Sequence, residues 1–290
     1  MVRIPVLEVL TEEVKKLYEV PAYQWTDGTV TEHDKNILKK EAEQESPFDK
    51  LNLKRNLHNS LNGGNAHIIV KEIHNVARIV ILRENKNQDE IYPWETWARV
   101  FQWFGKPKEN KLWQVYLYSS DVKRILPENG PIGPEHLNGG YTYPCNPDCI
   151  VVYRYEEATR VLIHELLHAS CTDDHEKPVE LREAATEAWA ELFLVALLSK
   201  GYIKKPTNSK NSKIKDVYDL WKIQDHYIQD LNHSVRTFHN VNTNQDYGAR
   251  YTTLREEVFK QFGVALNPHY TTKKIHTSRF TSPELDTYLI

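Results

Sequence analysis

Three segments in the middle of the chain have the patterns of extended strands. Leu112–Tyr118 alternates apolar and polar positions between polar flanks, and Ile150–Tyr155 is rich in β-branched residues. A loop rich in Pro, Gly and Asn separates them, and within it Asn138–Tyr143 has the composition of a short extended piece. His67–Leu82 also contains several β-branched residues, but its period is ambiguous between strand and helix. The pattern therefore predicts a small sheet.

The remaining periodic segments predict helices. Thr11–Leu61 is mostly helical and polar in pattern, with a turn at Ser46–Pro47, and Pro93–Phe101 spaces its large apolar groups like a buried helix. Further helices are expected at about 156–172, 178–200, 217–233 and 247–262. We therefore predict an α+β fold that is mainly helical, with its small sheet next to the helix at 156–172.

The breaks between these segments suggest three regions. Residues 1–61 form a helical lead-in that ends at a Gly-Gly break, 62–265 form the main domain, and 266–290 form a polar tail that we expect to be loosely held.

The composition is that of an ordinary globular protein. The chain has 290 residues, 40% of them hydrophobic and 27% charged, and a formal net charge of -3. This charge argues against nucleic acid as a partner. The apolar runs are too short to cross a membrane, and charges interrupt the first twenty residues, so neither a membrane span nor a signal peptide is expected.

Cysteine usage indicates a reducing compartment, because three cysteines are too few for a disulfide framework. An intracellular location is therefore predicted. Cys145 and Cys149 could bind a metal or close a small disulfide loop, but we expect two ordinary thiols beside a turn.

One short motif in the helix at 156–172 predicts chemistry. His164 and His168 are four residues apart, so on a helix they share a face and can offer two imidazole nitrogens to one cation. Glu165 follows about 100° around the helix, within reach of a metal-bound water. Among 13 histidines such a spacing arises by chance with a probability on the order of a few per cent. Its setting in an apolar helix after a strand favours a zinc site.

A catalytic zinc needs a third protein ligand, and the next helix offers a stripe of carboxylates. Glu183, Glu187 and Glu191 recur every four residues there. On its own, such a stripe is more typical of a solvated helix face. Because it follows the His-Glu-x-x-His motif, we interpret this stripe as the source of the third zinc ligand.

These residues together resemble the gluzincin group of zinc metallopeptidases, in which H-E-x-x-H is followed by a ligand Glu on a second helix. The similarity covers roughly Ile150–Leu198, with 18 residues between His168 and Glu187. The resemblance implies a zincin-like catalytic core that binds one Zn²⁺ through His164, His168 and Glu187. It also implies that Glu191 does not bind the metal itself and could orient a ligand histidine.

Other groups with this motif place the third ligand six residues after the second His, where this chain has Asp174. Those groups have a Gly at the position of Cys171, and a Cys takes a positive φ only at a cost. Asp174 therefore stays an alternative to Glu187.

The implied reaction is hydrolysis of a peptide or protein by a metal-activated water, with Glu165 as general base. The strand Ile150–Tyr155 resembles the edge strand along which such peptidases bind an extended substrate. An oxyanion donor is expected downstream of the third ligand, and Tyr247 and Tyr251 are favoured slightly among the candidates, which also include His226, His233 and His239. The alternative is a non-peptidase or catalytically inactive zinc-binding protein of zincin-like fold.

Overall fold

The computed structural model describes residues 3–87, 91–108, 111–204, 215–241, 243, 246–267 and 274–289. Its contacts divide the chain into two units, and neither is continuous in sequence. The sheet unit consists of Tyr23–Arg124 and Leu137–Thr172, and the helical unit consists of Met1–Ala22, Ile125–His136 and Asp173–Ile290. These limits fall at other places than the predicted regions 1–61, 62–265 and 266–290.

The described strands form one mixed six-stranded sheet in the order β1-β2-β3-β4-β6-β5. They are β1 (Trp25–Asp27), β2 (Ala66–Ile73), β3 (Ala77–Glu84), β4 (Trp113–Tyr118), β5 (Gly140–Thr142) and β6 (Ile150–Val152). β3, β4 and β6 run parallel, whereas β2 and β5 run antiparallel to their neighbours β3 and β6. The sheet therefore ends at β1 on one side and at β5 on the other.

The predicted fold class is confirmed at this level. Among the described residues the structure is α+β, about 49% helical, with a mixed sheet. β4 and β6 occupy the two predicted strands, and β5 lies within the predicted extended piece. The ambiguous segment His67–Leu82 forms the β2–β3 hairpin, and β1 lies in a region that was predicted to be helical.

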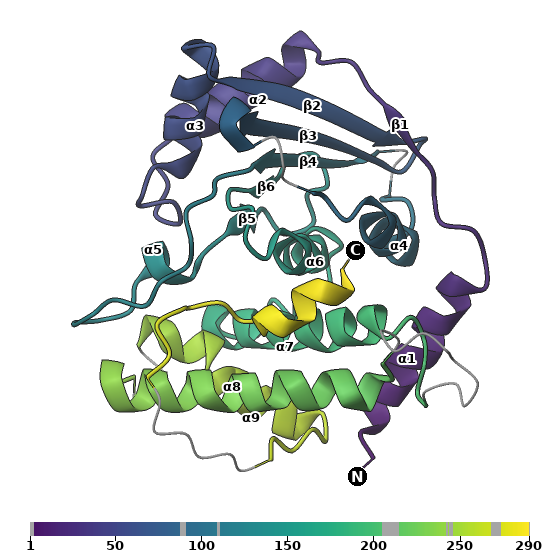
Figure 1. Cartoon of the computed structure of the whole chain (residues 1–290), viewed down its shortest axis with the longest axis vertical. Coiled ribbons are helices and arrows are strands. Elements are labelled where there is room, and N and C mark those ends of the chain that lie inside the picture. Colours follow the sequence, from purple (N-terminus) through teal and green to yellow (C-terminus); the bar gives the residue numbers. More distant parts are fainter. Residues whose placement is uncertain are drawn as a thin grey trace. The chain divides into compact units, whose positions relative to one another are not determined.

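Helices cover both faces of this sheet (Figure 1). α2 (Glu32–Glu43) and α3 (Leu53–Asn62) lie on one face, and α4 (Trp94–Phe104) and α6 (Ala158–Ala169) lie on the other. Alternate residues of the strands serve the two faces, as the pleat requires. Under α2 and α3, a buried cluster joins Leu38 and Leu57 to Val80, Tyr116 and Val151.

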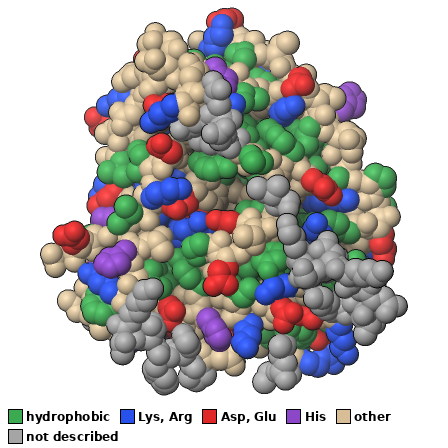
Figure 2. Space-filling view, viewed as in Figure 1, with side chains coloured by type: hydrophobic (Ala, Val, Ile, Leu, Met, Phe, Trp, Pro, Cys, Tyr) green, Lys and Arg blue, Asp and Glu red, His purple; other side chains and the backbone are tan. Residues whose placement is uncertain are grey.

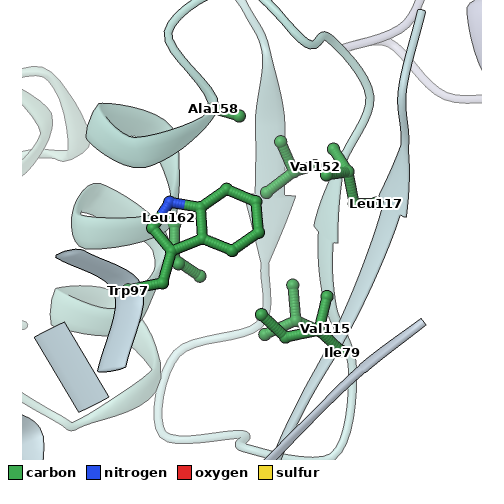
Figure 3. Close-up of a pocket in the computed structure, with 7 residues that line it drawn as sticks. All are labelled: Ile79, Trp97, Val115, Leu117, Val152, Ala158 and Leu162. Atoms are coloured by element: carbon green, nitrogen blue, oxygen red, sulfur yellow. The ribbon is translucent and has the colours of Figure 1, made fainter. Parts of the chain in front are cut away.

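The opposite face of the sheet packs against α4 and α6 through a wholly apolar layer (Figure 3). Its residues are Ile79, Trp97, Val115, Leu117, Val152, Ala158 and Leu162. They leave a cavity of about 10 Å³, which is roughly the space of one water-sized sphere. The cavity is therefore a small packing gap beneath α6, and a substrate does not fit there.

The helical unit packs long helices against one another. It contains α1 (Pro5–Tyr18), α7 (Val179–Leu198), α8 (Val217–His239) and α9 (Thr253–Gln261), two 3₁₀ helices at Tyr247–Tyr251 and Pro283–Tyr288, and most of the single turn α5 (Pro134–Leu137). A further 3₁₀ turn at Asn85–Asn87 belongs to the sheet unit. α7 contacts α1, α8 and α9, and 13 of its residues are buried, so it forms the centre of this unit.

The segment after α9 is packed, contrary to the expectation of a loosely held tail. Phe280 is 2% exposed, and its carbonyl accepts a hydrogen bond from the buried side chain of Gln224 on α8. The same amide group of Gln224 accepts from the N–H of Ser282. Residues 268–273 and 290 of the predicted tail lie outside the described residues.

In the described part of the chain, none of the helices combines the length and the apolar composition that a membrane crossing needs. Charged side chains of both signs are interspersed over the face seen in Figure 2, in keeping with the small net charge.

Replacing Leu162 by Ala tests the apolar layer beneath α6. Leu162 is 2% exposed, and its removal enlarges an existing gap that its neighbours cannot close. We expect a loss of about 2–5 kcal/mol in the free energy of unfolding, measured in urea. Leu51→Ala, at a leucine that is 44% exposed, is the matched control and should change stability by less than about 1 kcal/mol. Equal losses in the two variants would contradict this account of the layer.

Candidate metal centre

The two histidines of the motif face the same point from α6. Their Nε2 atoms are 3.0 Å apart, their ring centroids are 4.7 Å apart, and both residues are 7% exposed. Nitrogens bound to one tetrahedral zinc at about 2.0–2.1 Å would lie roughly 3.3 Å from each other. The observed spacing is close to that value, so the pair fits a shared ion without a change of helix geometry.

α6 begins immediately after a buried ion pair that fixes the approach of the chain. Glu157 precedes the helix in a left-handed conformation (φ 61°), and its carboxylate accepts from Arg124 at 2.7 Å. Glu156 accepts from the main-chain N–H of Arg124 at 2.7 Å. Both glutamates therefore bind Arg124, and the helix starts at Ala158, two residues after the predicted start near 156.

Glu165 lies against the edge strand β5. A Cβ placed on Gly140 would come within 3.0 Å of a carboxylate oxygen of Glu165 and within 2.6 Å of Val161. Only glycine fits there, and its absent side chain lets the strand approach the helix. The candidate general base therefore lies beside the main chain of β5, 4% exposed.

The identity of this edge strand corrects one prediction. Ile150–Tyr155 was expected to be the edge strand beside the motif, but its strand β6 is paired on both sides, with β4 and β5. The edge is β5, which also contacts α6. Strand order depends on pairing between distant segments, so the sequence pattern of β6 gave no sign of its neighbours.

The far end of α6 is joined to the segment after β5 by a disulfide between Cys145 and Cys171. The expectation that Cys145 and Cys149 are two ordinary thiols is therefore wrong for Cys145. Cys149 is free, and burial raises the pKa of its thiol to about 12, with the charge of Glu41 adding to the effect. The bridge removes the reason for predicting a reducing compartment. An intracellular location stays a prediction.

The carboxylates predicted to supply the third ligand lie on α7, in the helical unit. Glu187 is 3% exposed and Glu191 is fully buried, so the solvated-face interpretation fails for these two residues. Glu191 lies 3.9 Å from the guanidinium of Arg255 and accepts from the hydroxyl of Thr281 at 3.5 Å. Its carboxylate is thus part of a buried ion pair within the helical unit.

Tyr247 and Tyr251 lie in the 3₁₀ helix that precedes α9, with their hydroxyl oxygens 3.5 Å apart. Tyr251 stacks on Phe280 and is 6% exposed. Burial raises its pKa well above the usual value near 10, and the neighbouring Tyr247 and Glu183 add to this. Tyr251 therefore keeps its proton near neutral pH and can act as a hydrogen-bond donor.

The alternative ligand Asp174 lies in a turn, with its side chain 52% exposed and 3.5 Å from the ammonium of Lys177. Cys171 was expected to avoid a positive φ, which weighed against Asp174, but Cys171 has φ 63°. That expectation was wrong, because Cys171 follows α6 in the left-handed position that usually holds glycine. Asp174 stays an alternative.

The predicted site residues belong to two different units of the structure. His164, Glu165 and His168 belong to the sheet unit, and Glu187, Tyr247 and Tyr251 belong to the helical unit. The other oxyanion candidates, His226, His233 and His239, all lie on α8. Sequence reasoning missed Gly140 and the Cys145–Cys171 bridge. The Gly-Gly pair at 139–140 was the available signal for the first.

Comparisons of this chain with models of known protein families, with curated proteins and with solved structures give no match. The assignment of chemistry therefore depends on the residues themselves.

The buried His239 makes the stability of the helical unit depend on pH. Burial lowers the pKa of this imidazole, and the charge of Lys274 lowers it further. Below about pH 6.5 the unfolded chain gains a proton here that the folded chain resists, so acidification lowers the free energy of unfolding.

Replacing His239 by Asn removes this proton uptake. Between pH 7.5 and 5.5 the variant should lose less stability than the wild type, by up to about 1.4 kcal/mol per pH unit. Urea unfolding at several pH values measures the difference. Parallel pH profiles for the two proteins would show that His239 does not contribute.

Proposed function

We propose that this protein is a zinc-dependent metallohydrolase that cleaves peptide bonds. The observation that carries the proposal is the pair of Nε2 atoms, 3.0 Å apart on α6, with Glu165 between them in sequence and beside an edge strand. Two imidazoles and a carboxylate are a donor set that suits zinc, whereas magnesium and calcium prefer oxygen ligands alone.

The third ligand in this proposal is a carboxylate of α7. The resemblance to gluzincins favours Glu187. Glu183, one turn earlier, is the rival that would complete a His–His–Glu set with His164 and His168. Glu191 is a poorer candidate, because its carboxylate lies against Arg255 and Thr281.

The proposed site residues then have distinct roles in the reaction. A bound zinc ion would supply Lewis acidity toward a carbonyl oxygen and toward water. Glu165 takes a proton from the attacking water and delivers it to the departing amine. A protonated tyrosine, Tyr251 or Tyr247, donates a hydrogen bond to the oxygen that gains negative charge.

The edge strand β5 supports a peptide as the substrate. An unpaired strand edge offers main-chain donors and acceptors to an extended chain, which can add to the sheet as a further strand. β5 lies beside Glu165, so such a chain would have its peptide groups next to the general base. This assigns to β5 the role that the sequence had suggested for Ile150–Tyr155.

Replacing Glu165 by Gln separates catalysis from metal binding. The variant keeps a side chain of the same size but cannot take up the proton, so we expect at least about a 100-fold loss in cleavage of a mixed peptide library. Elemental analysis should find zinc at the wild-type level. Glu32→Gln, at a side chain that is 81% exposed, is the matched control. Undiminished cleavage by the Glu165 variant would refute the mechanism.

Single Gln substitutions at Glu183, Glu187 and Glu191 test the third ligand. We expect the Glu187 variant to lose roughly 100-fold or more in zinc affinity, and the Glu183 variant to stay near the wild type. The Glu191 variant should keep its zinc but lose about 3 kcal/mol of stability, because the buried charge of Arg255 is left without its carboxylate. Competition with a chromogenic chelator and urea unfolding give the two readouts. Loss of zinc in the Glu183 variant alone would transfer the ligand role to that residue.

A further inference from the structure

The Cys145–Cys171 disulfide closes a loop of the chain that contains the motif helix α6. Cys145 lies three residues after β5 and Cys171 two residues after α6, and their Cα atoms are 4.5 Å apart. The bridge spans 26 positions of the chain, which contain β6 and the whole of α6. The two segments that border the candidate site in the sheet unit are therefore covalently joined at one end.

The main chain of His168 is hydrogen-bonded to both cysteines of the bridge. Its carbonyl oxygen accepts a hydrogen bond from the N–H of Cys145 at 3.0 Å and another from the N–H of Cys171 at 3.2 Å. Both ends of the bridge thus donate to the same peptide group, that of a proposed metal ligand. A change at the bridge acts on His168 without an intermediate residue.

Both cysteines have a backbone conformation that is costly for a residue with a side chain. Cys145 has φ 62° and Cys171 has φ 63°, in the left-handed region that residues with a side chain adopt at a cost. The bridge holds the two residues together in this conformation, in which both N–H groups point to the carbonyl of His168. Without the bridge, this link between the segment after β5 and the end of α6 consists of hydrogen bonds alone.

The bridge is also accessible. Both cysteines are exposed, so a dithiol in solution can reach the sulfur atoms. Cys149 is partly buried and has a raised thiol pKa, so it is a poor nucleophile for exchange with the bridge.

We propose that the Cys145–Cys171 disulfide is a redox switch that controls the order of the last turn of α6 and, through His168, the affinity of the candidate metal centre. A dithiol attacks one sulfur to give a mixed disulfide and a free cysteine thiol. Its second thiol then releases the other cysteine, so the dithiol becomes a cyclic disulfide and the protein gains two thiols. The part that concerns the metal rests on the proposed function, whereas the part that concerns α6 does not.

Amide hydrogen exchange of the metal-free protein tests the effect on α6. Reduction, or the double substitution Cys145→Ser and Cys171→Ser, should speed exchange at the amides of Ser170, Cys171 (or its Ser replacement) and Thr172 by at least about tenfold. The amides of Val161–Ile163, about one turn after the start of α6, should change little. Cys149→Ser is the matched control and should behave like the wild type. Unchanged exchange at 170–172 would overturn the proposal.

Zinc affinity tests the effect on the metal centre. The double variant contains no thiols at the bridge that could bind zinc themselves, so it is compared with oxidised wild type in competition with a chromogenic chelator. We expect affinity to fall by about 10-fold to 100-fold, the usual effect of losing a group that orients a ligand. Phosphine treatment, followed by gel filtration, should leave the double variant unchanged. Equal affinities of double variant and oxidised wild type would overturn the metal part of the switch.

The two experiments distinguish a failure of the redox switch from a failure of the proposed zinc-dependent function. If oxidised wild type binds no zinc, the proposed function fails and the coupling to a metal fails with it. Hydrogen exchange then still decides whether the bridge controls α6. If zinc binds and neither readout responds to the bridge, the function stands and the switch is refuted.

Discussion

The close approach of α6 to β5, the last strand of the sheet, is the constraint on which the sheet unit depends. A helix normally packs on the face of a sheet at a distance set by side chains on both elements. Here Gly140 contributes no side chain, and Val161 and Glu165 of α6 occupy the space that its Cβ would need. This contact places the polar side of α6 beside main-chain atoms of β5, while Leu162 and Leu166 remain buried.

Buried charges hold the segments around this contact. Arg124 binds Glu157 at the start of α6, and Arg154 donates to the carbonyls of Asn138, Val122 and Lys123. On the other side of β5, the hydroxyl of Tyr141 donates to Glu41 and accepts from Lys54. β5 has only three residues, and these polar contacts compensate for its short ladder.

What the sequence predicted well depends on local periodicity. The four-residue spacing of His164 and His168 and the strand pattern of Leu112–Tyr118 are each properties of one segment, so the helix and the strand were predicted correctly. The β2–β3 hairpin was ambiguous because Ala77–Leu82 is buried on both faces and therefore does not alternate. The identity of the edge strand and the partner of Cys145 depend on contacts between distant segments, which no local pattern encodes. For the same reason the third ligand and the oxyanion donor, on α7 and in the 3₁₀ helix, stay predictions.

The discontinuous units imply an order of folding during synthesis. All residues of the sheet unit have been made once the ribosome has passed Thr172, whereas the helical unit needs Asp173–Ile290 as well as Met1–Ala22. α1 is therefore translated before the sheet unit, yet its packing partners α7 and α8 are made after it. Until then, the apolar side of α1 formed by Leu7 and Val14, both fully buried in the finished protein, lacks its native cover. A chaperone that binds short apolar segments would find this helix during that interval.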